Sequence, residues 1–241
     1  VVVLGGGVIG VEFASVWRSF GVDVTIVEAL PHLLPAEDVA SSKALERAFR
    51  KRGISFQLGK RFASLSQSAD SATVTLDDGS ELVADYVLVA VGRGPVTAGL
   101  GYEEAGVVLD RGFVQTDERL RTAADHVWAV GDIVPGLQLA HRGFQQGIFV
   151  AEEIAGLAPV LVPDVDVPRV AYSHPEVASV GLTEAQAQDR YGSDAVKAYE
   201  YNLAGNGRSE IIGTSGIVKI VRRADGPVVG AHLVGDRVET D

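Results

Sequence analysis

The sequence has 241 residues, of which 46% are hydrophobic and 22% are charged. This length is sufficient for one large domain or two smaller ones, each with its own core. The formal net charge is −11, so the surface would repel nucleic acid and anionic membranes, and we expect neither as a partner. No apolar run approaches the roughly 20 residues of a membrane helix, and no signal peptide is visible. These observations predict a soluble, cytoplasmic protein.

Two residue types are absent, because the sequence contains no Cys and no Met. Without Cys, the chain can form no disulfide, thiolate nucleophile or Cys-ligated metal site. The first residues, Val1–Leu4, already have the character of a core strand, whereas chain termini normally lie at the surface. We therefore expect this chain to be a fragment of a longer protein.

The first part of the sequence predicts a β-α-β unit followed by a hairpin. Phe13, Ala14 and Trp17 have helical spacing, and Gly21 and Gly53 are typical of helix ends. The sequence Asp-Asp-Gly-Ser over 77–80 is a strong turn signal. The expected elements are strands over 1–4 and 24–27, a helix between Gly10 and Gly21, a helix over about 37–52, and hairpin strands over 72–76 and 81–84.

Two further strands are expected in the middle of the chain. Residues 86–91 are apolar throughout, as expected of a strand that is buried on both faces of a parallel sheet. Residues 127–130 predict a second buried strand, which leads into Gly131 and Asp132. A helix is expected to follow Ala140 and to end at Gly156. Its apolar stripe consists of Phe144, Ile148, Ala151 and Ala155.

The composition changes around Pro159, Pro163 and Pro168, and we place a domain boundary there. Beyond it, the sequence Thr-Glu-Ala-Gln over 183–186 is a capping box that opens a short helix. Strands over 217–221 and 228–234 are separated by a turn that contains Gly226 and Pro227. This region therefore predicts an α+β domain with an antiparallel sheet.

The strongest local motif is the glycine pattern Gly5-x-Gly7-x-x-Gly10 between a strand and a helix. Gly5 permits a tight turn, Gly7 lets a pyrophosphate approach the backbone, and Gly10 lets the helix pack on the strand. The N-terminus of the helix would then direct free N–H groups at the phosphates. The alternative is a glycine-rich turn without a ligand. The preceding strand, the following helix and an acidic residue at the end of the next strand favour the dinucleotide site.

That acidic residue, Glu28, indicates which dinucleotide is bound. A carboxylate at this strand end accepts hydrogen bonds from the ribose hydroxyls and repels a 2′-phosphate. An NADP site would need a basic residue nearby, but of the residues 29–32 that follow, only His32 can carry positive charge. The alternative is a solvated glutamate at a strand end. The pattern favours NAD.

A second possible ligand region lies around Asp132 and Ala140. An Asp at the carboxyl end of a parallel strand is well placed to bind a ligand hydroxyl, although such a residue is also common in turns. The helix after Ala140 provides another N-terminus, which would stabilise negative charge placed against it.

Four motifs follow one another along the chain: Gly5–Phe13, Val91–Pro95, Val127–Asp132 and Pro175–Glu184. In this order and spacing they resemble the flavoprotein disulfide reductases, the FAD-dependent pyridine nucleotide-disulfide oxidoreductases. Within that family the sequence looks most like the dihydrolipoamide dehydrogenases, because of residues 139–143 and 205–209. The resemblance covers essentially the whole chain, and the combination is highly specific.

The resemblance implies an α/β fold in three parts. Residues 1–112 would form a Rossmann-like NAD-binding domain, and residues 113–162 would form the C-terminal part of an FAD-binding domain. Residues 163–241 would begin an α+β dimerisation domain. Compared with the family, the chain would be a fragment lacking both ends.

The resemblance also assigns cofactor-binding residues. Ile9 would lie at the nicotinamide pocket and Glu12 near its carboxamide, while Phe62 and Gly92 would contact the adenine and nicotinamide sides. Asp132 would bind the ribitol chain of FAD, and the Ala140 N–H would bind the pyrimidine edge of the flavin. The full NAD set is Gly5, Gly6, Gly7, Val8, Ile9, Gly10, Val11, Glu12, Glu28, Phe62 and Gly92.

The activity that the resemblance implies is oxidation of dihydrolipoamide to lipoamide with NAD, through FAD and a redox disulfide. The dihydrolipoamide would be carried by a 2-oxoacid dehydrogenase complex or a glycine cleavage carrier, and the enzyme would be a homodimer. The family's Cys pair and His–Glu pair are not in this chain. His174-Pro175-Glu176 only superficially resembles the latter pair, and we assign it to the interface domain. We therefore name no catalytic residue and no metal ligand, and expect the chain alone to be inactive.

Two alternatives remain open. Another disulfide reductase or a quinone reductase could share this scaffold, and a Cys pair upstream would exclude the quinone type. A non-enzymatic NAD-binding module would have no use for the Asp132 and Ala140 region. We also expect the sheet of the interface domain to present an apolar face that carries Ile217, Ile220, Val229 and Leu233.

Overall fold

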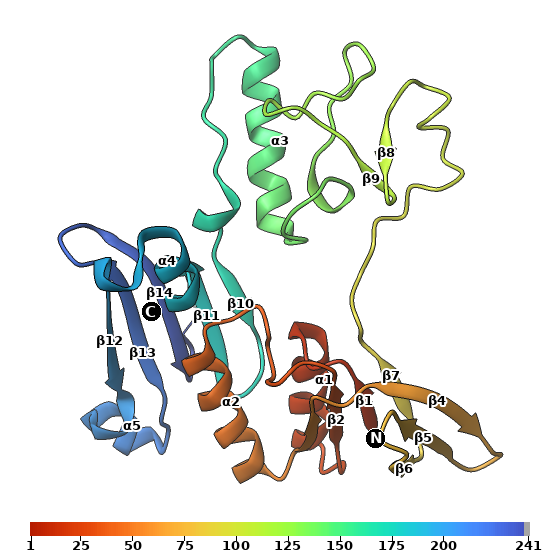
Figure 1. Cartoon of the computed structure of the whole chain (residues 1–241), viewed down its shortest axis with the longest axis vertical. Coiled ribbons are helices and arrows are strands. Elements are labelled where there is room, and N and C mark those ends of the chain that lie inside the picture. The colour runs from red at the N-terminus through yellow and green to blue at the C-terminus, as the bar shows by residue number, and fades with distance from the viewer. Residues whose placement is uncertain (239–241) are drawn as a thin grey trace. The chain divides into compact units, whose positions relative to one another are not determined.

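The computed structural model describes residues 1–238, and the chain divides into two compact units (Figure 1). One unit joins Val1–Gly92 with the chain from Pro168 onward, and the other is Arg93–Val167. Residues 239–241, the last of the region expected as the dimerisation domain, lie outside the described residues. None of the helices within 1–238 has the length and apolarity to cross a bilayer.

The predicted β-α-β unit is confirmed. Its four parallel strands have the order β3-β2-β1-β7, and two helices connect β1 to β2 and β2 to β3. The second helix begins where the Asp38 carboxylate accepts a hydrogen bond from the Ala40 amide (2.9 Å), and it ends at Gly53, which has a left-handed backbone. The elements are β1 (Val2–Leu4), α1 (Val8–Ser19), β2 (Thr25–Glu28), α2 (Val39–Arg52), β3 (Ser55–Leu58) and β7 (Val87–Val89).

The expected burial of residues 86–91 on both faces is wrong. The strand is present as β7, but Val89 and Val91 are 64% and 74% exposed. The physical reason is its position. β7 lies at the edge of the sheet, and among the described strands it pairs only with β1.

The two faces of the parallel sheet pack against different layers. Val3 and Ile26 point toward α1 and α2, whereas Leu4 and Val27 point toward an antiparallel three-stranded sheet. That sheet contains the predicted hairpin, which is confirmed, together with one further strand. Its strands are β4 (Phe62–Gln67), β5 (Ala72–Leu76) and β6 (Glu81–Ala84).

The predicted antiparallel sheet after the proline-rich segment is also confirmed. It has five strands in the order β10-β11-β14-β13-β12, and its inner face packs on α2, where Phe49 shares a core with Val177 and Val234. The capping box at Thr183 is present. The elements are β10 (Arg169–Ala171), β11 (Glu176–Gly181), α4 (Glu184–Tyr191), η3 (Ser193–Ala195), β12 (Val196–Asn202), η4 (Leu203–Gly205), α5 (Gly207–Ile212), β13 (Ile217–Arg223) and β14 (Val228–Gly235).

Two of the four residues expected on the outer face of this sheet lie elsewhere. Ile217 lies on the inner face and is 3% exposed, because side chains alternate along a strand and residues 217 and 220 must point in opposite directions. Ile220 and Leu233 lie on the outer face, where each is partly exposed. Val229 lies at the bulge between β13 and β14 and packs against the buried cluster of Ala187, Val196 and Val221.

The second unit has little regular structure. Its helix after Ala140 is confirmed, but the expected strand over 127–130 is wrong. Within the described chain, Trp128 makes only an isolated bridge to Arg121, and a strand requires a continuous partner. Of the apolar stripe on the helix, Phe144 is 71% and Ile148 52% exposed. The elements are β8 (Leu109–Asp110), β9 (Phe113–Val114), η1 (Gly131–Ile133), α3 (Ala140–Ile154) and η2 (Asp164–Asp166).

A buried cation joins α2 to the five-stranded sheet. Lys219 Nζ lies 2.8 Å from Asp38 Oδ1 and 2.7 Å from Glu184 Oε2. Burial opposes the charge of Asp38, but hydrogen bonds from Lys219 and from the Glu184 and Ala40 amides outweigh it and lower its pKa. The folded pKa of Asp38 therefore lies below its ordinary value of 3.8. Its contribution to stability is present above that value and is lost as the pH falls through the folded pKa.

We predict that Asp38→Asn, which keeps a capping side chain but removes the charge, lowers the free energy of unfolding at pH 7 by about 2 kcal/mol. The difference from the wild type should shrink below about pH 4 and vanish in stronger acid. Urea unfolding at several pH values measures it. Asp23→Asn is the control, because Asp23 pairs with Arg18 but is fully exposed, and an equal effect there would contradict the role of burial.

Candidate functional site

The glycine turn brings β1, β7 and α1 into close contact. A Cβ at Gly5 would overlap the carbonyl of Ala90, and a Cβ at Gly10 would overlap the carbonyl of Gly5. Gly5 also has a φ of 109°, which other residues avoid. The start of α1 can therefore lie directly at the carboxyl ends of β1 and β7 only with glycine at these two positions.

Gly7 differs from the other two glycines, because nothing lies within 4 Å of where its Cβ would be. It is the N-cap of α1, has no side chain to cap the helix, and no acidic residue occupies the first turn. The first amides of the helix therefore lack a side-chain partner, and the positive end of the helix dipole is not neutralised. This arrangement fits a pyrophosphate.

Glu28 ends β2 beside this turn and is 8% exposed. Its Oε2 accepts a hydrogen bond from the Gly6 amide (2.6 Å), and its Oε1 accepts one from the Leu30 amide (2.8 Å). Each carboxylate oxygen has a second lone pair, so the group can also accept hydrogen bonds from ribose hydroxyls. The two amides hold the carboxylate in place before any ligand arrives.

The predicted residues in α1 have different environments. Val8 is 43% exposed and Ile9 is half-buried, so both are accessible at the start of the helix. Val11 is fully buried, and its amide donates to the Gly7 carbonyl, so it supports the turn from within the core. Glu12 Oε1 accepts a hydrogen bond from the Tyr172 amide (2.7 Å), which leaves its other oxygen for a ligand.

Phe62 and Gly92 lie near the same edge of the parallel sheet. Phe62 begins β4, shortly after β3 ends, and is 46% exposed. The short segment between β3 and β4 is held at the end of β2, because the Lys60 amide donates to the Glu28 carbonyl (3.1 Å). Gly92 follows Ala90, which touches Gly5. The carboxyl edge of the sheet therefore gathers the glycine turn, Glu28 and both of these residues.

Two features of this edge were missed from the sequence. The loop over 29–37 covers the glycine turn, since the Leu34 amide donates to the Gly6 carbonyl (2.8 Å) and the Leu33 amide donates to Glu46 of α2 (3.2 Å). The sequence contained one signal of this loop contact. Glu46 is an acidic residue on the apolar face of a predicted helix, so it needed a buried hydrogen-bond donor such as the Leu33 amide.

The second missed feature is a basic residue near Glu28. Lys60 is distant in sequence, and its ammonium binds Asp78 at 2.5 Å. Hydrogen bonds from Lys60 and Ser80 lower the pKa of Asp78 well below its usual range. The Lys60 ammonium is therefore already paired with a carboxylate.

In the second unit, Asp132 and Ala140 come together at the start of α3. Gly131 has a φ of 76°, its amide donates to Gln146 of the helix (2.7 Å), and it packs against Gly143. Leu139, the N-cap of α3, makes no side-chain capping bond, and the first turn has no acidic residue. Asp132 and the uncapped helix start are both exposed.

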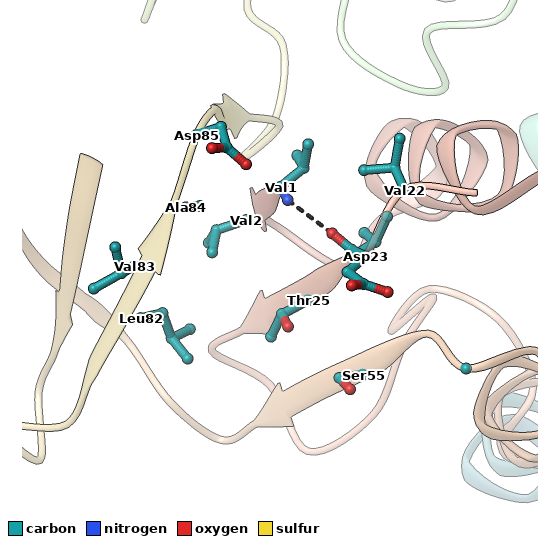
Figure 2. A pocket seen from close by; sticks show the side chains of 12 residues that line it. Val1, Val2, Val22, Asp23, Thr25, Ser55, Leu82, Val83, Ala84 and Asp85 are labelled. Atoms are coloured by element: carbon teal, nitrogen blue, oxygen red, sulfur yellow. Dashed lines mark hydrogen bonds between the residues drawn. The ribbon is translucent and has the colours of Figure 1, made fainter. Parts of the chain in front are cut away.

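A pocket of about 500 Å³ lies at the opposite edge of the parallel sheet (Figure 2). It is lined by residues at the amino ends of the strands, including Val2, Thr25 and Ser55, and by Val83 and Asp85. Dinucleotides bind outside the carboxyl ends of parallel strands. The pocket in Figure 2 is therefore not part of the candidate site.

Two family models match the chain. The model described as pyridine nucleotide-disulphide oxidoreductase covers residues 1–147, and the model of the dimerisation domain of the same family covers residues 167–240. The chain belongs to the pyridine nucleotide-disulphide oxidoreductases. This result confirms the family that the motifs indicated.

Similar curated proteins are dihydrolipoyl dehydrogenases. The one from Bacillus subtilis is 36% identical over 99% of this chain and 51% of its own length. The one from Mycobacterium bovis is 41% identical over 99% of this chain and 52% of its own length. The chain thus spans about half the length of the curated relatives it matches.

Solved structures agree with the fold. LpdA from Mycobacterium tuberculosis has a TM-score of 0.87 and 33% identity, covering 97% of this chain and 51% of its own. The HOCl-induced flavoprotein disulfide reductase RclA from Escherichia coli has a TM-score of 0.90 and 32% identity, covering 99% of this chain and 55% of its own.

We predict different effects for two alanine substitutions in the glycine turn. Gly10→Ala should destabilise the protein, because its Cβ overlaps backbone of Gly5 that cannot move without separating helix from strand. Gly7→Ala should leave the melting temperature nearly unchanged, since its Cβ meets nothing, but it should weaken NADH binding where the pyrophosphate would lie. Thermal melts and NADH titrations of both variants measure this. Full NADH affinity in Gly7→Ala would contradict the placement of the pyrophosphate.

Proposed function

We propose that the whole protein is an NAD-dependent enzyme that oxidises dihydrolipoamide to lipoamide through FAD and a redox disulfide. Support comes from the family of the chain and from its 36–41% identity to curated dihydrolipoyl dehydrogenases. The observation that carries the NAD assignment is the buried Glu28 carboxylate, which the Gly6 and Leu30 amides hold beside the open glycine turn.

The residues of the first unit would bind NAD. The amides of Gly7, Val8 and Ile9 would bind the pyrophosphate at the uncapped start of α1, and Glu28 would accept hydrogen bonds from the adenosine ribose. Ile9 would border the nicotinamide and Glu12 its carboxamide. Gly5, Gly6, Gly10 and Val11 would shape the turn, and Phe62 and Gly92 would flank the two ends of the ligand.

The residues of the second unit would bind part of FAD. Asp132 would accept hydrogen bonds from the ribitol chain, and the Ala140 amide would donate to the pyrimidine edge. Bound FAD would supply the two-electron redox chemistry between the dithiol and NAD. The uncapped N-terminus of α3 would stabilise negative charge on the ring, which favours the reduced, anionic state.

We further propose the domain boundaries expected from the sequence, at about residues 112 and 162, with the dimerisation domain beyond. The substrate would be dihydrolipoamide on a 2-oxoacid dehydrogenase complex or a glycine cleavage carrier, in the cytoplasm. The chain contains no Cys, so the redox disulfide would lie in another part of the protein, and this chain alone would be inactive.

A second candidate within the family is a disulfide reductase with a different substrate. The similarity to RclA, whose TM-score of 0.90 exceeds the 0.87 of LpdA, is the observation that favours it. Assay of the full-length protein with NAD and dihydrolipoamide separates the two, because only the first proposal requires steady turnover of that substrate.

Dimerisation would use the outer face of the five-stranded sheet. Ile220 and Leu233 lie there with Val218, and Tyr199 and Tyr201 of the neighbouring strand are 59% and 56% exposed. Large apolar and aromatic side chains on one flat face are typical of stable interfaces between subunits. We therefore propose a two-fold homodimer.

We predict that the chain binds NADH more tightly than NADPH, because a 2′-phosphate would meet the Glu28 carboxylate. The difference should be about 1–3 kcal/mol, and Glu28→Ala should narrow it. Fluorescence titration with both nucleotides measures the affinities. Glu81→Ala is the control, since Glu81 is an exposed carboxylate at the start of β6, on the three-stranded sheet. Equal affinities in the wild type would contradict the NAD assignment.

We predict that the full-length protein has twice the mass of one chain in light scattering. Ile220→Lys should shift it toward monomer, because a charge would be buried in the interface. Val83→Lys is the matched control, as an apolar strand residue that is 71% exposed on a different sheet. A monomer across a hundredfold concentration range in the wild type would show that the interface is misplaced.

A further inference from the structure

The Lys219 cluster, which consists of Lys219, Asp38 and Glu184, is a set of charges within the packed interface between α2 and the five-stranded sheet. The side chains of Lys219 and Asp38 are 9% and 3% exposed. Burial opposes the charge of Lys219, but hydrogen bonds to both carboxylates outweigh it and raise its pKa. Lys219 is therefore charged at neutral pH.

The stability of a packed interface does not require buried charges. Well-packed apolar residues in place of a buried ion cluster are often equally stabilising or better, whereas ion clusters define a single geometry. Lys219 fixes two helix starts at once, because Asp38 is the N-cap of α2 and also accepts a hydrogen bond from the Glu184 amide at the start of α4 (3.0 Å). The cluster therefore determines where α2 begins relative to the sheet.

The start of α2 in turn holds the loop over 29–37. Ser42 Oγ of the helix donates to the Leu34 carbonyl (3.3 Å), and Glu46 accepts from the Leu33 amide. Leu34 is buried with a φ of 48°, a left-handed conformation that a leucine keeps only where its surroundings impose it. The helix thus holds the loop in a conformation that the loop alone would avoid.

The other end of the loop is the candidate dinucleotide site. The Leu30 amide binds Glu28, and the Leu34 amide binds the carbonyl of Gly6, whose own amide binds Glu28. Leu33 lies so close that a Cβ on Gly6 would be 2.7 Å from its Cδ2. Hydrogen bonds therefore run without a break from Lys219 through Asp38, Ser42, Leu34 and Gly6 to Glu28.

We infer that Lys219 is a positioning residue for the dinucleotide site: through Asp38 and the loop over 29–37 it sets the place of the Glu28 carboxylate. The five-stranded sheet thereby determines the selectivity between NADH and NADPH, although the amides that hold Glu28 belong to Gly6 and Leu30. The effect on selectivity rests on the proposed function, whereas the effect on the loop does not.

The test compares NADH and NADPH binding in Lys219→Met, alone and combined with Glu28→Ala. Lys219→Met should weaken NADH binding about fivefold, which is a typical effect of substitutions along packed networks. It should leave the affinity for NADPH nearly unchanged. In the Glu28→Ala background the same substitution should change NADH binding less than twofold, because Lys219 acts through Glu28. Arg52→Met is the matched control. Arg52 joins the sheet to α1 through His174 and Ser15, so its loss should lower stability without changing the NADH to NADPH ratio.

Hydrogen exchange of the ligand-free protein gives an independent reading. Exchange at the Leu30 and Leu34 amides should be faster in Lys219→Met than in the wild type, while the Ile54 amide in the core should not change. If the wild type fails to bind NADH, the proposed function fails, and this measurement still decides the effect on the loop. If Lys219→Met does not fold, Lys219→Met/Asp38→Asn removes both deeply buried charges and takes its place. A lower melting temperature with wild-type selectivity and wild-type exchange at Leu30 and Leu34 would overturn the inference.

Discussion

The carbonyl of Gly5 and the Cα of Gly10 lie closer together than any side chain would permit, and the rest of the site depends on this contact. It places the first turn of α1 directly beyond β1, so that unpaired amides and a positive dipole end face the carboxyl edge of the parallel sheet. It also places Gly6 where its amide reaches Glu28. In the proposed site, the backbone amides at the start of α1 would donate to phosphate, and the Gly6 amide helps to hold the Glu28 carboxylate that would accept from ribose.

The layers behind this edge explain how the site keeps its geometry. Successive side chains of β1 and β2 point alternately toward the helices and toward the three-stranded sheet. Both strands are therefore packed on both faces. The five-stranded sheet adds contacts to both helices that flank the site. It reaches α1 through Glu12 and Ser15 and reaches α2 through Lys219. The unit that would bind NAD and the sheet that would form the dimer are thus one packed body.

Features that depend on local sequence could be predicted. The glycine turn, the hairpin at Asp78, the capping box at Thr183 and the antiparallel sheet follow from short patterns, and the structure contains each of them. Features that depend on distant partners could not. Lys219 and Asp38 are 181 residues apart in sequence, and Lys60 reaches the end of β2 only after the chain has passed through β3.

Two of the errors had the same physical origin. An apolar run such as 86–91 does not reveal whether its strand lies at the centre or the edge of a sheet, and 127–130 has strand-like composition without a continuous partner in the described chain. Ile217 was placed on the outer face although the two-residue period alone separates it from Ile220. That error could have been avoided from the sequence.

The central claim is that a dinucleotide binds at the carboxyl edge of the parallel sheet, with its pyrophosphate at the start of α1. Amide chemical shifts in a titration with NADH test it most directly, because they report the contacts residue by residue. The account predicts that the largest changes occur at Gly6, Gly7, Val8 and Ile9 and at Leu30, whose amide binds Glu28. Changes concentrated instead at Val2, Ser55 and Asp85, which line the pocket at the opposite edge, would contradict it.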